Sequence, residues 1–204
     1  MSDDASWSLH VVRLMIGGKI QNYRNILRRY IRDYGENEDI NRAVQVLERA
    51  KRDALKAQDK TELIGYEGMA SNAYFEVLPI LILNQKTDFP FHGRNRRPPK
   101  DAVNAMLSFA YTLIANDVAA ALETVGLDPY VGFLHTLRPG RTSLALDMME
   151  ELRAYLGDRF ILSLINKRQI SVKAFLFQGD NGVVMTVKGK KTFITAWQAR
   201  KREV

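Results

Sequence analysis

The segment LHVVRLMIGGKIQNYRNILRRYIRDY, residues 9–34, decides the fold class that we expect. Its apolar side chains recur every three or four residues, which is the period of an amphipathic α-helix. They are Val12, Ile16, Ile20, Tyr23, Leu27, Tyr30 and Tyr34. Similar helical patterns follow at residues 39–58, from about 61, at 101–122, from 142 or 143 to about 156, and at 158–166. We therefore predict a mainly α, multi-helix domain.

The C-terminal part of the chain carries a β signal. Residues 174–178 and 183–187 flank Gly179-Asp180-Asn181-Gly182, a sequence typical of a β-hairpin turn. A basic amphipathic helix is expected after it, at residues 186–201. We predict one helical domain over residues 1–204 with at most this small hairpin, and a small basic appendage at 167–204.

Prolines and glycines predict where helices end. Pro79 should bend or end the helix that begins near residue 61. Residues 89–100 contain several prolines and a glycine, so we expect a loop there. Pro99 before residues 101–122 and Gly126 after them are ordinary helix boundary signals.

Composition favours a polyanionic partner. The 204 residues include 30 Lys or Arg and 23 Asp or Glu, a net charge of +7, which favours nucleic acid over a membrane. The absence of cysteine excludes disulfides, zinc–thiolate sites and thiol catalysis. The longest uninterrupted apolar run, residues 77–83, is far shorter than the roughly 18 residues of a membrane span. With no signal-peptide pattern at the N-terminus, we expect a cytoplasmic protein.

Four residues form a candidate metal site: Glu67, His135, Asp147 and Glu150. Asp147 and Glu150 are three residues apart on a predicted helix, so their side chains share one face. His135 precedes a Pro-Gly turn and could fold back over that helix, and Glu67 would come from a different helix. Carboxylates favour Mg²⁺ or Mn²⁺, and an imidazole increases the tolerance for Mn²⁺. Such an ion can polarise a phosphoryl oxygen and activate a hydroxyl nucleophile.

A less specific interpretation competes with this one. Acidic pairs on a helix are most often solvated, and a single histidine before a turn is more often structural. Two features favour the metal site. Gly65 and Gly68 beside Glu67 would let another backbone approach closely, and Arg138 and Arg141 near His135 would supply positive charge for a phosphate.

A basic loop is a second candidate site. It carries Arg94, Arg96, Arg97 and Lys100, which could contact the backbone of a nucleic acid without reading its sequence. The alternative is a solvated loop. No P-loop, nucleophile elbow or dinucleotide-binding glycine pattern is present, and we interpret Gly17-Gly18-Lys19 as helix packing.

Several ordered motifs resemble the CRISPR-associated integrases of the Cas one family (Cas1). The motifs that carry the resemblance are Gly65-Tyr66-Glu67-Gly68, the segment from Arg96 to Phe109, Gly126-Leu127-Asp128-Pro129, Gly132-Phe133-Leu134-His135, and the segment from Ser143 to Glu150. Gly18-Lys19-Ile20-Gln21-Asn22 near the start and residues 191–193 and 196–198 near the end extend the resemblance over nearly the whole chain.

The resemblance implies a function and a set of site residues. Glu67, His135 and Glu150 would be the metal ligands, Asp147 a supporting acid of the catalytic set, and Arg138 a cation lining the site. Members of this family are metal-dependent DNA endonucleases and integrases that work with a small partner, Cas two (Cas2), to insert new spacers into the CRISPR array. The implied chemistry is attack of a spacer 3′-hydroxyl on a phosphodiester, a transesterification without a covalent enzyme intermediate.

The chain is expected to differ from the family in extent. Family members carry an N-terminal β-rich domain that supplies most of the homodimer contact and much of the partner surface, and we expect this chain to be the helical catalytic domain alone. DNA, Cas2 and a second copy are therefore the partners implied for an intact member. Two alternatives stay open: a casposon-type transposase domain, and a basic DNA-binding module that is catalytically inactive as a fragment.

Overall fold

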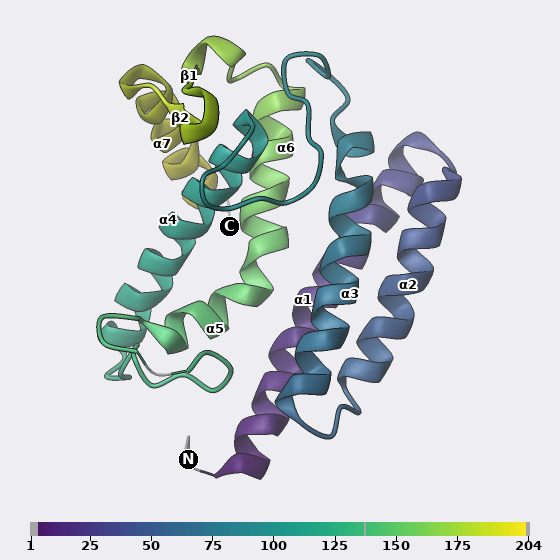
Figure 1. The fold of residues 1–204 in the computed structure, drawn as a ribbon, viewed down its shortest axis with the longest axis vertical. Coiled ribbons are helices and arrows are strands. Elements are labelled where there is room, and N and C mark those ends of the chain that lie inside the picture. Colours follow the sequence, from purple (N-terminus) through teal and green to yellow (C-terminus); the bar gives the residue numbers. More distant parts are fainter. Residues whose placement is uncertain (1–3, 137, 203–204) are drawn as a thin grey trace. The chain divides into compact units, whose positions relative to one another are not determined.

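The computed structural model describes residues 4–136 and 138–202, and the chain folds mainly as α-helices (Figure 1). This confirms the predicted fold class. The helices are α1 (Ala5–Tyr34), α2 (Glu38–Ala54), α3 (Lys60–Val77), α4 (Ala102–Thr124), α5 (Ser143–Leu152), α6 (Arg159–Asn166) and α7 (Val187–Arg202). Shorter elements are the 3₁₀ turns η1 (Leu78–Leu81), η3 (Val172–Ala174) and η4 (Gly179–Asn181), the π-helical segment η2 (Arg153–Asp158), and the strands β1 (Phe175–Phe177) and β2 (Val183–Met185).

The chain divides into two compact units. Unit 1 comprises residues 1–74 and 111–156, and unit 2 comprises residues 75–110 and 157–204. The second unit therefore includes the predicted appendage at 167–204, but it also takes in the basic loop and the start of α4. The candidate residues Glu67, His135, Asp147 and Glu150 all belong to unit 1.

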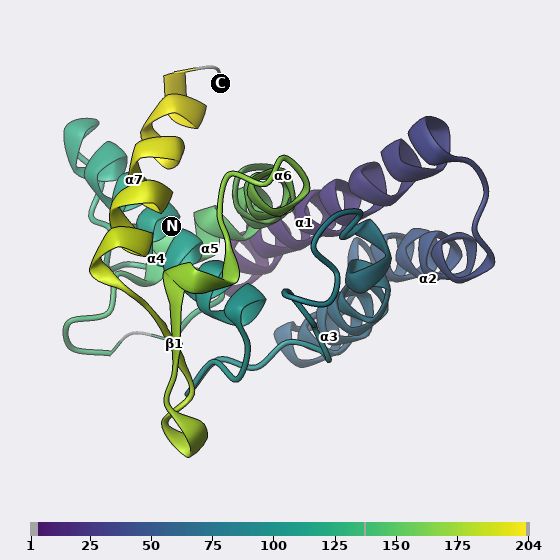
Figure 2. The same cartoon turned by 90° about the horizontal axis from the view of Figure 1, so that it is seen from above.

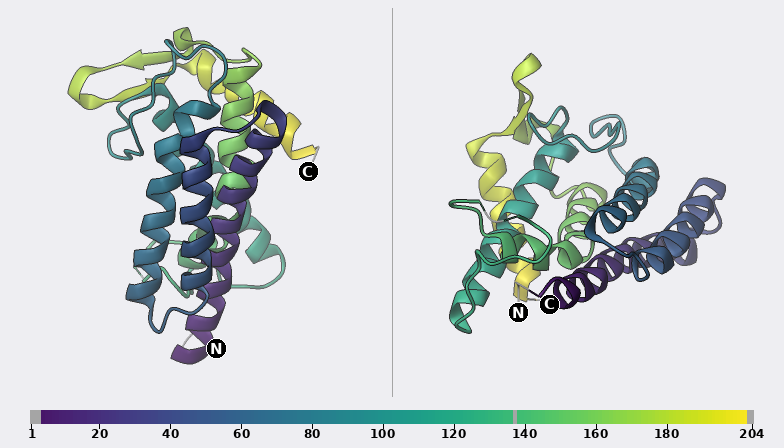
Figure 3. Two further views of the ribbon diagram at one scale, coloured as in Figure 1. Left: turned by 90° about the vertical axis from the view of Figure 1, so that its right-hand side faces the viewer. Right: turned by 60° about the horizontal axis from the view of Figure 1, so that its bottom comes forward.

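In unit 1, α1, α2 and α3 lie side by side (Figures 2 and 3). The apolar stripe predicted on α1 is buried from Val12 to Leu27, whereas Tyr34 in the last turn is 62% exposed. Asp4 caps α1 by accepting a hydrogen bond from the backbone of Trp7, and Asn37 caps α2 in the same way through Ile40. These caps satisfy backbone donors that the helix itself leaves without a partner.

Close packing of α1 explains its two adjacent glycines. A Cβ on Gly18 would lie 2.6 Å from Oε1 of Glu151, and one on Gly17 would lie 2.9 Å from Cδ2 of Leu55. Asn22, one turn further along α1, donates to the backbone oxygen of Glu151 at 2.9 Å. The interpretation of this segment as helix packing is confirmed, and α5 is thereby fixed against α1.

In unit 2, a β-hairpin contacts the basic loop, and a cluster of aromatic side chains packs α7 against α6. Strands β1 and β2 pair antiparallel, with Phe175 opposite Met185, which confirms the predicted hairpin in a shorter form. Val183 donates from its backbone N–H to the oxygen of Pro99 at 2.7 Å, so the hairpin is bonded to the end of the basic loop. Phe193 and Trp197 of α7 pack edge-on against Phe160 of α6.

Helix α4 is long and apolar. By length and composition it could cross a membrane, unlike the shorter apolar run at residues 77–83. Inside the protein, 44% of its most apolar window is buried. A core helix of a globular protein meets the same criterion, so the observation is weak evidence for a membrane span.

Candidate metal centre

Two of the predicted ligands meet at a buried lysine. Lys19 lies on α1 with 3% of its side chain exposed. Its Nζ forms an ion pair with Oε1 of Glu67 on α3 and lies 2.8 Å from Oε2 of Glu150 on α5. Three helices thus bring two carboxylates to one cation, as the hypothesis of a shared site requires.

Each carboxylate has a further partner. Glu67 also accepts a hydrogen bond from the hydroxyl of Ser71 at 2.7 Å, one turn along α3. Nη2 of Arg153 lies 2.9 Å from Oε1 of Glu150, and its guanidinium lies over the Tyr111 ring at 4.9 Å from the centroid. Within the described residues, Glu150 Oε2 is buried and accepts no well-aligned hydrogen bond despite its proximity to Lys19.

The charges of this cluster stabilise one another. Burial alone lowers the pKa of the Lys19 ammonium, but Tyr23, Glu150 and Glu67 outweigh burial and raise this pKa above its ordinary value. Burial likewise raises the pKa of Glu67, and the charge and hydrogen bond of Lys19, with the hydrogen bond of Ser71, outweigh it and lower this pKa. Both groups therefore stay ionised at neutral pH.

Asp147 anchors the segment that carries His135. Its carboxylate is 1% exposed and accepts the backbone N–H groups of Phe133 at 2.6 Å, Leu134 at 2.8 Å and His135 at 3.0 Å. Its Oδ1 also lies 2.5 Å from Nδ1 of the His135 ring. A carboxylate that takes one ring nitrogen and leaves the other for a metal is the usual support of a metal-binding histidine.

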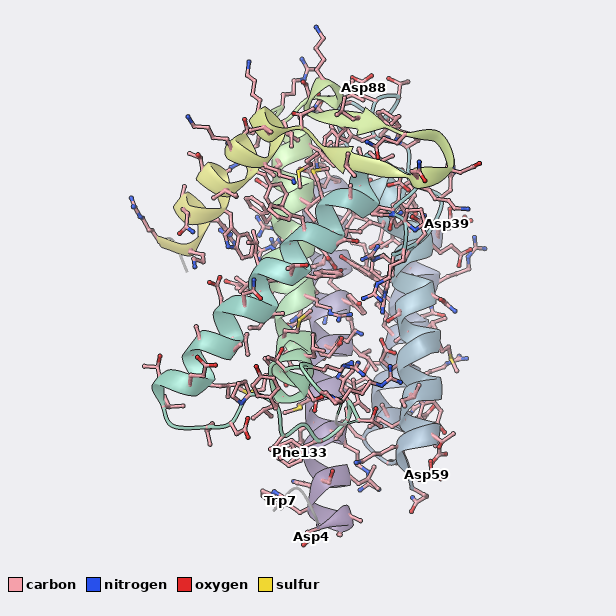
Figure 4. The ribbon with its side chains drawn as sticks, turned by 60° about the vertical axis from the view of Figure 1, so that its left-hand side comes forward. Asp4, Trp7, Asp39, Asp59, Asp88 and Phe133 are labelled. Atoms are coloured by element: carbon pink, nitrogen blue, oxygen red, sulfur yellow. The ribbon has the colours of Figure 1, made fainter. Side chains whose placement is uncertain are left out.

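A glycine makes this anchoring feasible. A Cβ on Gly132 would lie 2.7 Å from Cβ of Ser143 and 2.9 Å from Oδ2 of Asp147, so a side chain would push the segment off α5. The adjacent Phe133 lies near the N-terminal end of α1 (Figure 4), where its backbone oxygen accepts hydrogen bonds from Ser8 and Lys60.

The structure brings the four residues together as two pairs. Glu67 and Glu150 share Lys19, and His135 is bound to Asp147, one turn before Glu150 on α5. Among residues 4–136 and 138–202, no three His, Asp or Glu side chains are spaced as a closed metal-binding group. The chemistry nevertheless suits a hard divalent cation, because two carboxylates, an imidazole and a buried oxygen without a well-aligned hydrogen bond lie on neighbouring elements.

One expectation about the surroundings is wrong. Gly65 and Gly68 have no heavy atom within 4 Å of an added Cβ, so no backbone approaches them closely. The DNA contact of Arg94 stays a prediction; within the protein its guanidinium donates to Asn104 Oδ1 at 2.8 Å and to Ser108 Oγ at 3.1 Å. These hydrogen bonds tie the basic loop to α4.

The other predicted cations are accessible. The candidates that the structure leaves exposed or half-buried are Arg96, Arg97, Lys100, Arg138 and Arg141.

Lys19 and Arg153 were missed as site residues. The sequence did contain a signal for Lys19, because this residue lies on the same face of α1 as the apolar residues Ile16, Ile20 and Tyr23. A lysine in a buried stripe requires a carboxylate partner. Arg153 gives a weaker signal. It follows Glu150 by three residues, and acidic and basic residues at this spacing are common on solvent-exposed helix surfaces.

Buried acidic and basic side chains from three helices therefore define a candidate site in this helical protein. The chain matches the family described as CRISPR associated protein Cas1 over residues 1–199, and it belongs to that family.

Two relatives illustrate the match. The chain is 47% identical to the CRISPR-associated endonuclease Cas1 1 of Chlorobaculum tepidum over 206 residues, covering 100% of this chain and 60% of that protein. A solved Cas1 protein from Thermotoga maritima is 28% identical with a TM-score of 0.84, over 98% of this chain and 60% of that one. The chain thus spans about three fifths of each.

A third solved structure shares the fold. It is described as a partial Cas6-RT-Cas1–Cas2 complex and is 24% identical with a TM-score of 0.87, over 98% of this chain and 59% of that one.

Proposed function

We propose that this chain is the catalytic helical part of a metal-dependent DNA endonuclease and integrase that inserts new spacers into a CRISPR array. The observation that supports it most is the convergence of Glu67 and Glu150 on one buried cation position, with the Asp147-held His135 on the same face of α5. Membership of the Cas1 family supports the same conclusion.

The metal would be Mg²⁺ or Mn²⁺, held by Glu67, Glu150 and the Nε2 of His135. When bound, such an ion polarises a phosphoryl oxygen and stabilises the charge that develops on it. With Nδ1 of His135 engaged by Asp147, Nε2 is the ring nitrogen that would bind the metal. Arg138 and Arg141, in the turn that follows His135, would neutralise the phosphate that reacts.

The proposed reaction is a transesterification. The oxygen of a DNA 3′-hydroxyl forms a new bond to phosphorus while the bond to the leaving 3′-oxygen breaks, so the number of phosphodiesters is unchanged. The hydroxyl loses its proton and the leaving oxygen gains one.

The proposed partners are DNA and, for the intact protein, a second copy and Cas2 in the cytoplasm. Exposed Arg96, Arg97 and Lys100 would contact the DNA backbone. The solved structure described as containing both Cas1 and Cas2 supports the partner proposal.

Charge-neutralising substitutions test the catalytic proposal. Glu67→Gln and Glu150→Gln should each lower metal-dependent cleavage and strand transfer on labelled DNA ends by at least about 100-fold, the scale of a lost charge-stabilising group. Glu76→Gln, on an exposed position of α3, is the matched control and should retain full activity. Undiminished activity in both site variants would refute the ligand assignment.

One observation favours the non-catalytic alternative. The described residues include no closed group of three metal-binding side chains, as expected for a domain that binds DNA without cleaving it. Salt-dependent DNA binding with no cleavage in either Mg²⁺ or Mn²⁺ would support this alternative.

A further inference from the structure

We propose that Lys19 is an internal counter-ion that holds Glu67 and Glu150 together in the metal-free protein and competes with the divalent cation for both carboxylates. The inference rests on the proposed function and adds a role for a residue outside the ligand set. It follows from the position of Nζ, which contacts one oxygen of each carboxylate.

The ammonium group is held in place from several sides. Lys19 lies between Ile16 and Ile20, both of which are at most 1% exposed. Its Nζ lies 5.8 Å from the centroid of the Tyr23 ring, which stacks on Tyr74 at 4.0 Å. The side chain has little room to seek other partners, so its charge acts on the two carboxylates.

The charge balance of the cluster decides the direction of the effect. Without metal, the carboxylates of Glu67 and Glu150 face the positive charges of Lys19 and Arg153. Removal of Lys19 leaves one buried negative charge without compensation, which is strongly unfavourable. A divalent ion bound to the same carboxylates would add two positive charges beside the Lys19 ammonium, so metal and ammonium oppose each other.

Arg153 does not play the same part. It pairs with the other oxygen of Glu150, Oε1, and lies over Tyr111. It can therefore keep its partner while Glu150 Oε2 turns to a metal, whereas Lys19 would have to release Oε2 of Glu150 and Oε1 of Glu67.

The proposal predicts two opposite effects of one substitution. Lys19→Met should lower the stability of the 204-residue chain in chelator, measured by urea unfolding. The same substitution should tighten Mn²⁺ binding by about tenfold, equivalent to 1.4 kcal/mol, measured by calorimetry. If Lys19 only filled space, methionine would preserve both stability and Mn²⁺ affinity. If Lys19 only prearranged the ligands, Lys19→Met would lower stability and leave Mn²⁺ affinity unchanged or weaker.

Control variants make the test specific. Lys51→Met removes a lysine whose Nζ donates to Gln21 at 2.7 Å, and it should leave Mn²⁺ affinity unchanged. Lys19→Met combined with Glu67→Gln should be more stable in chelator than Lys19→Met alone, because the uncompensated charge is gone. Should Lys19→Met fail to fold without metal, Lys19→Gln keeps a hydrogen-bond donor without the charge and should show the same opposite effects.

The outcomes separate this inference from the proposed function. Mn²⁺ binding by Lys19→Met or Lys19→Gln that is equal to or weaker than that of the unaltered chain overturns the competition while leaving the metal site intact. No Mn²⁺ binding by any variant, or by the unaltered chain, overturns both. No recovery of stability in the double variant overturns the counter-ion role by itself.

Discussion

At the scale of single residues, burial and hydrogen bonding separate roles that the sequence presents as alike. Asp147 and Glu150 are both buried acids on one face of α5. Asp147 uses both oxygens on three backbone N–H groups and the His135 ring, so it positions the histidine and has no oxygen to give to a metal. Glu150 retains a buried oxygen, Oε2, that lies 2.8 Å from Lys19 Nζ and accepts no well-aligned hydrogen bond from the described residues, as the proposed ligand role requires.

Glu151, the next residue, allows a pH test. Burial against Gly18 raises the pKa of the Glu151 carboxyl above its ordinary value, so ionisation of this group opposes folding as the pH rises through the ordinary carboxyl pKa. Glu151→Gln should therefore stabilise the protein modestly at pH 7 and have no effect below the ordinary carboxyl pKa. Urea midpoints at pH 7 and pH 3.5, measured in chelator, check this; a difference that persists at pH 3.5 would contradict it.

At the scale of elements, helical periodicity predicted most of the fold. The period on α1 and the proline at position 79 gave boundaries close to those observed, since these signals depend on neighbouring residues only. The continuation from α5 through the π-helical η2 into α6 was predicted as two separate helices. A π-helical segment retains backbone hydrogen bonding without the 3.6-residue period, so a periodicity argument fails there.

Two glycines of unit 1 should respond oppositely to alanine. Gly65 lies inside α3 with nothing near an added Cβ, so Gly65→Ala should stabilise the protein by about 0.5–1 kcal/mol. Gly132→Ala should destabilise it by about 1–3 kcal/mol, because the new Cβ would overlap with Ser143 and Asp147. Denaturant unfolding of both variants measures the difference, and equal effects would show that the structure around Gly132 can relax.

At the scale of the whole molecule, the positive charge is unevenly distributed. Unit 2 contains fifteen Lys or Arg and six Asp or Glu, a net +9, whereas unit 1 contains fifteen and seventeen, a net −2. The unit that carries the candidate metal centre is therefore slightly acidic. The charge that favours a polyanion lies in the other unit, including the exposed lysines of α7.

DNA affinity should follow this distribution. Replacement of Lys188, Lys190 and Lys191 by Gln should weaken DNA binding and reduce the slope of log affinity against log salt, by up to about 0.9 for each phosphate that is no longer neutralised. Replacement of Arg28, Arg49 and Arg52, which are exposed in unit 1, is the matched control for the removal of three charges. A larger decrease in affinity in the control would place the DNA surface on unit 1.

The candidate site was predictable only in part. Family motifs indicated Glu67, His135 and Glu150, and the i, i+3 spacing placed Asp147 near Glu150. The convergence on Lys19 could not be read from local sequence, because Lys19, Glu67 and Glu150 come from three helices. Spacing along the chain does not reveal such a convergence, and it does not show that Arg94 bonds to Asn104 of α4.

The bond between Val183 and Pro99 links two surface segments that are far apart in the sequence. Gly182, with a φ of +85°, lies so close that a Cβ there would be 2.5 Å from the Pro99 oxygen. A residue exchanged in the hairpin turn would therefore displace Arg96, Arg97 and Lys100 without touching any of them. The backbone path of the basic loop therefore depends on a glycine more than 80 positions further along the chain.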